Sequence, residues 1–188
     1  METRGAYILR ENTGTSGLER TLRDAVYILA YHQVPTLVAG GLAVQEHGYF
    51  RVTTDADIIV PDVFEAVDLL TADLSGPFNT VPGRRERVVD KRNGVMVDLL
   101  PAGCVYNQGC KVPFPLPDKV VDVPRFVTLE KLISLKLDSW ANSPNRRLKD
   151  KADVIELIKA HNLPRDLLID PPVRHLYTET WDALQAET

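Results

Sequence analysis

The segment Asp55-Ala56-Asp57-Ile58-Ile59-Val60 constrains the fold of this chain more than any other stretch. Its apolar end is typical of a buried strand, and in a strand the side chains of Asp55 and Asp57 point to the same face. Their Cα atoms then lie about 6 to 7 Å apart, so both carboxylates can reach one or two metal ions. A solvated strand end is the common alternative for such a pair. Because Mg²⁺ prefers carboxylate, phosphate and water oxygens, we expect a metal site here.

A third carboxylate, Asp98, interrupts the apolar run at residues 95–100. Asn93-Gly94 before it is the dipeptide preferred in a two-residue type I′ hairpin turn, which predicts that residues 87–92 pair antiparallel with this run. Burying an unpaired carboxylate costs several kcal/mol, so Asp98 needs a metal ion or a basic partner. The candidate basic partners are Arg84, Arg85 and Arg87.

A glycine pair, Gly40-Gly41, closes a predicted short strand at residues 35–39 and precedes a brief helix. Glycine has no Cβ, so the backbone N–H groups of such a pair can approach a phosphate closely. An isolated Gly-Gly pair is more often only a turn. In this chain the glycines end one predicted strand and the acids begin the next, and the joint pattern predicts a phosphate and metal site.

These residues resemble a known superfamily. Gly40-Gly41, Asp55-x-Asp57 and the later strand acid Asp98 are similar to the signature of the nucleotidyltransferase fold shared with DNA polymerase beta. The longer string Arg51-x-Thr53-x-Asp55-x-Asp57 is most similar to the AbiEii-type branch. That branch contains the nucleotidyltransferase-like toxins of bacterial toxin–antitoxin and phage-defence systems.

The C-terminal half carries a second part of the resemblance. Residues 147–153, Arg-Leu-Lys-Asp-Lys-Ala-Asp, resemble the Arg-x-Lys-Asp-x-x-Asp motif of the AbiEii-type branch. Lys136, on the preceding predicted helix, shares the apolar face and therefore either snorkels to its edge or reaches a negative group. Asp150 and Asp153 either orient a lysine or favour the helix macrodipole. The chain departs from the superfamily in having Gly-Gly for the frequent Gly-Ser and a small Ala56, but no metal ligand is missing.

The resemblance implies an enzyme that transfers a nucleoside monophosphate from an NTP to an acceptor and releases pyrophosphate. It implies that Asp55, Asp57 and Asp98 bind Mg²⁺, for which Mn²⁺ can substitute, and that Asp98 helps to deprotonate the acceptor hydroxyl. The implied acceptor is a macromolecule such as tRNA, and the implied partner of such a toxin is a cognate antitoxin. The implied nucleotide-binding residues are Gly40, Gly41, Arg51, Thr53, Lys136, Lys149 and Asp150.

Other functions use the same residues. An aminoglycoside-type adenylyltransferase would modify a small amino sugar instead of a macromolecule. A non-catalytic module of the same fold would bind a nucleotide or a partner chain, but such modules usually lose one acid, and none is lost here. A two-metal hydrolase would use the carboxylates without explaining the glycine pair. The sequence leaves open the acceptor, the nucleotide base and the oligomeric state.

Composition restricts these functions only slightly. The chain has 188 residues, of which 44% are hydrophobic and 26% charged, as in a globular protein of one domain or one with a small appendage. A net charge of −4 disfavours indiscriminate nucleic-acid binding, although basic residues cluster at 84–92 and 146–151. The sequence lacks a run of ~20 apolar residues, and residues 1–5 do not begin a secretory signal, so we expect a cytoplasmic protein that does not enter a membrane. Cys104 and Cys110 match no zinc spacing and are expected to be free thiols.

The order of predicted elements indicates a mixed α+β fold, a small mixed sheet flanked by helices and followed by a helical C-terminal portion. We assign residues 1–124 to a nucleotidyltransferase-like core and residues 125–188 to the helical portion, with the site between them. Residues 101–124, rich in proline, are expected to form a flap or linker around a short strand at 119–123. The predicted helices are residues 18–32, 41–45, 61–73, 128–140, 146–161 and 173–185, the first capped by Thr15 or Ser16.

Overall fold

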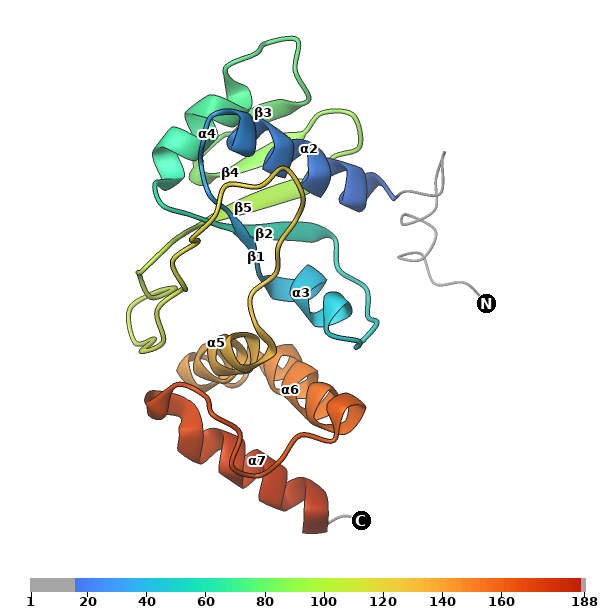
Figure 1. Cartoon of the computed structure of the whole chain (residues 1–188), viewed down its shortest axis with the longest axis vertical. Helices are drawn as coiled ribbons and strands as arrows, with labels where there is room; N and C mark the ends of the chain where they lie inside the picture. Colours follow the sequence, from blue (N-terminus) through green and yellow to red (C-terminus); the bar gives the residue numbers. More distant parts are fainter. Residues whose placement is uncertain (1–15, 187–188) are drawn as a thin grey trace.

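The structure is a computed structural model that describes residues 16–186 (Figure 1). Within these residues, one five-stranded mixed sheet is combined with six α-helices, which confirms the predicted α+β class. The strand order is β1-β2-β5-β4-β3. The N-terminal residues used to predict the absence of a signal, and the alternative cap Thr15, lie outside the described residues.

The sheet places two acid-bearing strands side by side. β2 (Asp55–Val60) pairs parallel with β5 (Met96–Pro101), and Asp57 lies directly opposite Asp98. The remaining pairs are antiparallel: β1 (Leu37–Val38) with β2, β5 with β4 (Arg84–Asp90), and β4 with β3 (Phe78–Val81). The crossover from β2 to β5 thus brings together acids that are far apart in the sequence.

Two helices cover one face of the sheet. Ser16 caps α2 (Gly17–Tyr31) by accepting a hydrogen bond from the Glu19 N–H, and Asp62 caps α4 (Val63–Thr71) in the same way. Both helices pack in Figure 1 over a hydrophobic core that includes Ala56, Ile58 and Val60 of β2. Since side chains alternate along a strand, Asp55 and Asp57 point to the opposite face.

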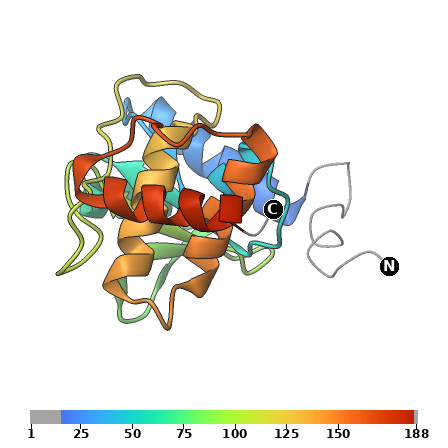
Figure 2. The same cartoon turned by 90° about the horizontal axis from the view of Figure 1, so that it is seen from below.

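The opposite face of the sheet packs against the C-terminal helices. α3 (Gly40–Glu46) follows β1, and α5 (Leu129–Asn142) and α6 (Leu148–His161) lie below the sheet in Figure 1. A 3₁₀ turn at Pro171–Val173 leads into α7 (Arg174–Ala186), which crosses α5 and α6 in Figure 2. A second hydrophobic core joins these helices to Leu37, Ile59 and Leu100 of the sheet. This core crosses the boundary predicted between residues 124 and 125, and the division into two portions stays a prediction.

The predicted two-residue type I′ turn at Asn93-Gly94 is wrong, although the antiparallel pairing around it is confirmed. The Asp90 N–H donates to the Val95 carbonyl at 2.8 Å, so residues 91–94 all belong to the turn. The fully buried Asp90 carboxylate accepts hydrogen bonds from Thr21 Oγ1 and from the Arg92 backbone N–H. The chain therefore winds around this carboxylate instead of reversing in two residues.

The strands differ from the sequence prediction in three further ways. Residues 119–123 form no strand, since they lie in an extended, largely exposed segment between prolines that belongs to no ladder of the described residues. β3 is a strand that the sequence did not predict. Of its four residues only Phe78 is buried, so its sequence shows no pattern typical of a strand. β4 begins at Arg84, three residues before the predicted strand at Arg87.

None of the helices in the described part of the chain is both long and apolar enough to cross a lipid bilayer. The sulfur atoms of Cys104 and Cys110 are free thiols. Both cysteines belong to the segment between β5 and α5, which in Figure 1 forms a loop below the sheet, then rises across the sheet and descends to α5.

Candidate functional site

The three predicted acids lie on one sheet face, on the neighbouring strands β2 and β5. Asp57 and Asp98 are register partners, and adjacent strands are about 4.8 Å apart. Asp55 precedes Asp57 on the same face of β2, where its carboxylate accepts a hydrogen bond from Thr53 Oγ1 at 3.2 Å. The fold thus gathers Asp55, Asp57, Asp98 and Thr53 within one small region.

Asp57 has the most perturbed carboxyl group of this region. Burial, followed by the negative charges of Asp55 and Asp98, raises the pKa of Asp57 to about 7. The Lys136 ammonium group acts in the opposite direction. Crowded carboxylates of this kind repel one another and are stabilised by a cation bound between them.

The glycine pair packs directly against the acid strand and the residues before it. Gly40 has a φ of +62°, and a Cβ at this position would lie 1.7 Å from Asp57 Oδ2. A Cβ on Gly41 would lie 2.4 Å from Thr53 Oγ1. Both glycines are therefore needed for the protein's own side chains to fit, and the predicted contact of their N–H groups with phosphate stays a prediction.

Asp98 is held by a basic partner, as one of the two alternatives for this residue predicts. Arg87, its cross-strand neighbour on β4, donates from Nε to one carboxylate oxygen and from Nη2 to the other, the second at 2.7 Å. The Arg87 side chain is 31% exposed and that of Asp98 is 16% exposed. The Asp98 carboxylate is thus turned toward β4 in this structure.

Lys136 lies at the centre of a buried ionic network. Its Nζ lies 2.7 Å from Asp150 Oδ1 and 2.9 Å from Asp153 Oδ2, so it reaches negative groups rather than snorkelling to solvent. Asp153 also accepts two hydrogen bonds from Arg51, at 2.6 and 2.8 Å, and Asp150 accepts one from Ser139 Oγ. Arg51 and Asp150, predicted to contact a nucleotide, are thus engaged with protein partners and hold Lys136 in place.

A cavity of about 110 Å³ lies beside Asp57. One part of its wall is polar and includes Gly40, Lys136, Asp150 and Arg147, while apolar side chains of α5 and of the loop after β5 form the rest. The volume is below the roughly 300 to 1,000 Å³ of most small-ligand sites, but a mostly apolar wall with a few polar groups is typical of them.

Sequence reasoning missed the wall that the loop after β5 supplies to this cavity. The Tyr106 ring lies 5.5 Å from the Arg147 guanidinium carbon, and Tyr106 packs edge-on against Phe114. Asp138 fixes the loop by accepting hydrogen bonds from the Lys111 and Val112 N–H groups at 2.8 and 2.9 Å. The sequence predicted a flap or linker at residues 101–124, but it did not indicate that Tyr106 and Phe114 line the cavity.

Lys149 lies at the exposed edge of the network. Partial burial and the positive charge of Arg51 lower the pKa of Lys149. The Lys149 ammonium group therefore lies close enough to the network to interact with its charges. Of the predicted site residues, the structure therefore gathers Asp55, Asp57, Asp98 and the glycines around the acid strands, and Lys136, Asp150 and Arg51 in the adjoining network.

The carboxylate oxygens of the site are the kind of ligand that a hard divalent cation such as Mg²⁺ prefers. Asp55 and Asp57 supply oxygen ligands on one strand face, and their mutual repulsion favours a bound cation. Across residues 16–186, however, no three His, Cys, Asp or Glu side chains already converge as a metal-binding group.

Comparisons with known proteins give a likeness in overall fold. No protein-family model matches the chain, and no curated protein matches it. Among solved structures, the antibiotic-resistance factor ANT(2'')-Ia is similar at 12% identity and a TM-score of 0.48, with 89% of this chain and 92% of that chain covered. JHP933 from Helicobacter pylori gives 13% identity and a TM-score of 0.39, with 90% and 94% covered. A provisionally named nucleotidyltransferase from H. pylori gives 13% and 0.40, with 88% and 95% covered. At these identities and TM-scores, the likeness assigns neither a family nor an activity to this chain.

Proposed function

We propose that this protein transfers a nucleoside monophosphate from an NTP to an acceptor hydroxyl and releases pyrophosphate. One observation carries the proposal: Asp57 lies between Asp55 and Asp98, against Gly40, at the border of a cavity that Lys136 also lines. Crowded carboxylates next to a cavity that Lys136 and Arg147 also line suit a metal-bound triphosphate, because the metal balances the carboxylates and the basic groups balance phosphate charge.

The reaction joins the acceptor oxygen to the α-phosphorus and breaks the bond from that phosphorus to the β-phosphate bridging oxygen. Asp98, once free of Arg87, accepts the proton of the acceptor hydroxyl. Lys136 and Arg147 face the negative charge of the leaving pyrophosphate from the cavity wall. Arg51 and Asp150 act indirectly by holding Lys136 and Asp153 in position.

Asp55 and Asp57, joined by Asp98, are the proposed ligands of Mg²⁺, for which Mn²⁺ can substitute. When bound, the ion would neutralise phosphate charge and polarise the reacting phosphoryl group. Gly40 and Gly41 would bring backbone N–H groups close to phosphate oxygens, and Thr53 would keep Asp55 oriented.

The proposed acceptor is an RNA, for which tRNA is the candidate that the sequence resemblance gives. Support comes from Arg87 on β4, because a partly exposed guanidinium group bound to one of the acids suits a phosphodiester chain. A toxin of the AbiEii type with a cognate antitoxin is part of this proposal. Transfer to an amino sugar is the alternative acceptor class.

Incubation with α-labelled NTPs and either total RNA or an aminoglycoside tests the function and the acceptor together. We expect Mg²⁺-dependent label on RNA, and Asp57→Asn should lower this incorporation at least about a hundredfold. Asp68→Asn, the same change on the exposed side of α4, is the matched control and should retain activity. Label on the aminoglycoside alone would replace the RNA proposal with the amino-sugar alternative. Tight Mg-ATP binding without transfer to either acceptor would indicate a non-catalytic module.

A further inference from the structure

Arg87 forms an ion pair with Asp98, the carboxylate that accepts a proton in the proposed reaction. Its two donors bind both oxygens of Asp98, which orients the carboxylate toward β4 and neutralises its charge. Asp98 cannot contribute to a metal group with Asp55 and Asp57 while this contact lasts, and no such group exists among the described residues. The ion pair is partly exposed, so the guanidinium can exchange its partner without unfolding the sheet.

The position of Arg87 indicates what could draw it away. In the strand order β1-β2-β5-β4-β3, Asp57 lies on β2, Asp98 on β5 and Arg87 on β4. The cavity beside Asp57 is lined by residues of β2, β5, α3, α5, α6 and the loop after β5, and Arg87 is absent from its wall. Arg87 therefore lies outside the cavity proposed for the nucleotide, on the strand beyond Asp98, where it remains available to an acceptor.

The other basic residues on β4 and in the turn after it already contact protein groups. Arg92 binds the buried Asp90 and Asp24, and Lys91 donates to the Leu74 carbonyl, so both stabilise the turn. At the exposed start of β4, Arg84 lies 3.5 Å from Glu86, and Arg85 stacks at 5.3 Å over the ring of Phe64 on α4, the helix that covers the face opposite to the acids. Among these residues, Arg87 alone contacts Asp98, so an anionic chain that reaches Asp98 meets its guanidinium group, whereas a polycationic amino sugar is repelled by it.

We propose that Arg87 is an acceptor-sensing positioning residue, which holds Asp98 away from the metal site until a phosphodiester of a polynucleotide acceptor binds the Arg87 guanidinium. Planar bidentate binding suits a phosphate as well as it suits a carboxylate, so the exchange conserves the hydrogen bonds of Arg87. The released Asp98 then faces Asp55 and Asp57. This inference rests on the proposed nucleotidyl transfer and adds a condition to it, namely that the complete acid site forms only with an anionic acceptor present.

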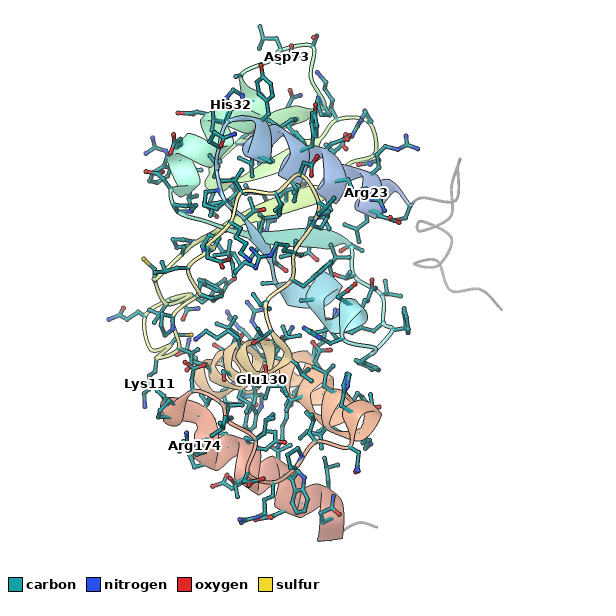
Figure 3. The ribbon with its side chains drawn as sticks, viewed as in Figure 1. Arg23, His32, Asp73, Lys111, Glu130 and Arg174 are labelled. Atoms are coloured by element: carbon teal, nitrogen blue, oxygen red, sulfur yellow. The ribbon has the colours of Figure 1, made fainter. Side chains whose placement is uncertain are left out.

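The first test measures Mn²⁺ binding to the nucleotide-free protein by titration calorimetry. Arg87→Met frees Asp98 and should increase Mn²⁺ affinity about tenfold, in line with the loss of one charge-assisted contact. Arg23→Met is the matched control, since Arg23 lies on α2 on the other side of the sheet and pairs with Glu19 (Figure 3). Arg87→Lys keeps the charge but cannot hold both oxygens, and should give an intermediate affinity. Equal Mn²⁺ affinities for wild type and Arg87→Met would overturn the proposal.

The second test adds a random-sequence RNA oligonucleotide, an aminoglycoside or a non-hydrolysable NTP analogue to the same titration. RNA should increase the Mn²⁺ affinity of the wild type several-fold, and Mn²⁺ should increase RNA affinity by the same factor, because coupling is reciprocal. The coupling should vanish in Arg87→Met. A full effect from the NTP analogue alone, or no effect of RNA, would contradict acceptor sensing.

The failure of this inference differs from that of the proposed function. If the wild type transfers label to RNA but shows no Mn²⁺–RNA coupling, Arg87 is a structural ion-pair partner and the transfer activity stands. If Asp57→Asn leaves the transfer unchanged, the proposed function fails whatever Arg87 does. Because Mn²⁺ binding is measured without turnover, the two results are independent.

Discussion

Gly40 is the residue whose side-chain size matters most to the site. A Cβ would lie 1.7 Å from Asp57 Oδ2, and the φ of +62° is unfavourable for other residues. We predict that Gly40→Ala destabilises the fold by about 2 kcal/mol or more in urea unfolding, since steric and backbone costs add. Gly83→Ala is the control, with a φ of +74° but nothing within 4 Å, and should cost only about 1 kcal/mol. Equal losses would mean that Gly40 does not pack against Asp57.

We predict that replacing Asp57 stabilises the metal-free protein but abolishes its stabilisation by Mg²⁺. Its raised pKa means that the ionised carboxylate destabilises the metal-free fold at pH 8. Asp57→Asn removes this charge and should increase the Tm of the metal-free protein by about 2 °C or more. Mg²⁺ should increase the Tm of the wild type but not that of Asp57→Asn. A metal-free Tm for Asp57→Asn below that of the wild type, with Asp68→Asn unchanged, would argue against this crowding of carboxylates.

At the scale of single residues, the sequence predicted the identity of the acids and glycines but not their contacts. Spacing along one strand was enough to place Asp55 and Asp57 on the same face, because strand alternation is a local property. The partner of Asp98 was restricted to three arginines, and only the β4–β5 register selects Arg87 among them. The roles of Arg51 and Asp150 depend on tertiary contacts that no local pattern encodes.

The turn between β4 and β5 is an element that depends on one buried carboxylate. Burial raises the pKa of Asp90, but hydrogen bonds from Arg92 and Thr21 outweigh burial, so the pKa is lowered overall. A lowered folded-state pKa contributes stability that is present above the unfolded value of about 4 and is lost as the pH falls through the folded-state value.

Asp90→Asn should therefore destabilise the protein by about 2 kcal/mol at pH 6, and the difference from the wild type should shrink toward pH 2. Urea unfolding across this pH range measures it. Asp118→Asn is the control, because the Asp118 carboxylate is exposed and its ion pair with Arg125 should add nothing measurable. A difference for Asp90→Asn that does not change with pH would contradict the account of this turn.

Elements with a strong periodic pattern were predicted well, and elements defined by their neighbours were not. α2, α4, α5 and α6 were predicted to within a few residues, because caps and apolar stripes are encoded locally. β3 was missed, since its four residues gain their strand conformation from pairing with β4. The false strand at 119–123 has β-branched residues but no neighbouring strand to pair with it among the described residues.

On the scale of the whole molecule, the ion pair of Arg51 and Asp153 connects the segment before β2 with α6. The two residues are separated by 102 positions, and their side chains are 12% and 1% exposed. Removing Asp153 leaves the largely buried Arg51 guanidinium without its carboxylate partner, whereas removing Arg51 leaves the buried Asp153 paired with Lys136 alone. A double-mutant cycle of Arg51→Met and Asp153→Asn should give a coupling energy of about 1.5 kcal/mol or more.

Arg165 and Asp182 provide the matched control for this cycle. They form the same two-point contact, at 2.7 and 2.8 Å, but on the protein surface. Solvent screens such a pair, so its cycle should give no coupling above the error of the measurement. Similar couplings for the two pairs would show that the buried contact does not join the sheet to the helices as described.

The central claim is that the acid site transfers a nucleoside monophosphate, and the position of the label in the NTP tests it most directly. The wild type is incubated with Mg²⁺, total RNA and an NTP labelled at either the α- or the γ-phosphate. We predict that α-label enters RNA while γ-label appears only in pyrophosphate, in equal amounts. Incorporation of γ-label into RNA, or release of γ-label as inorganic phosphate without any α-label in the acceptor, would contradict nucleotidyl transfer.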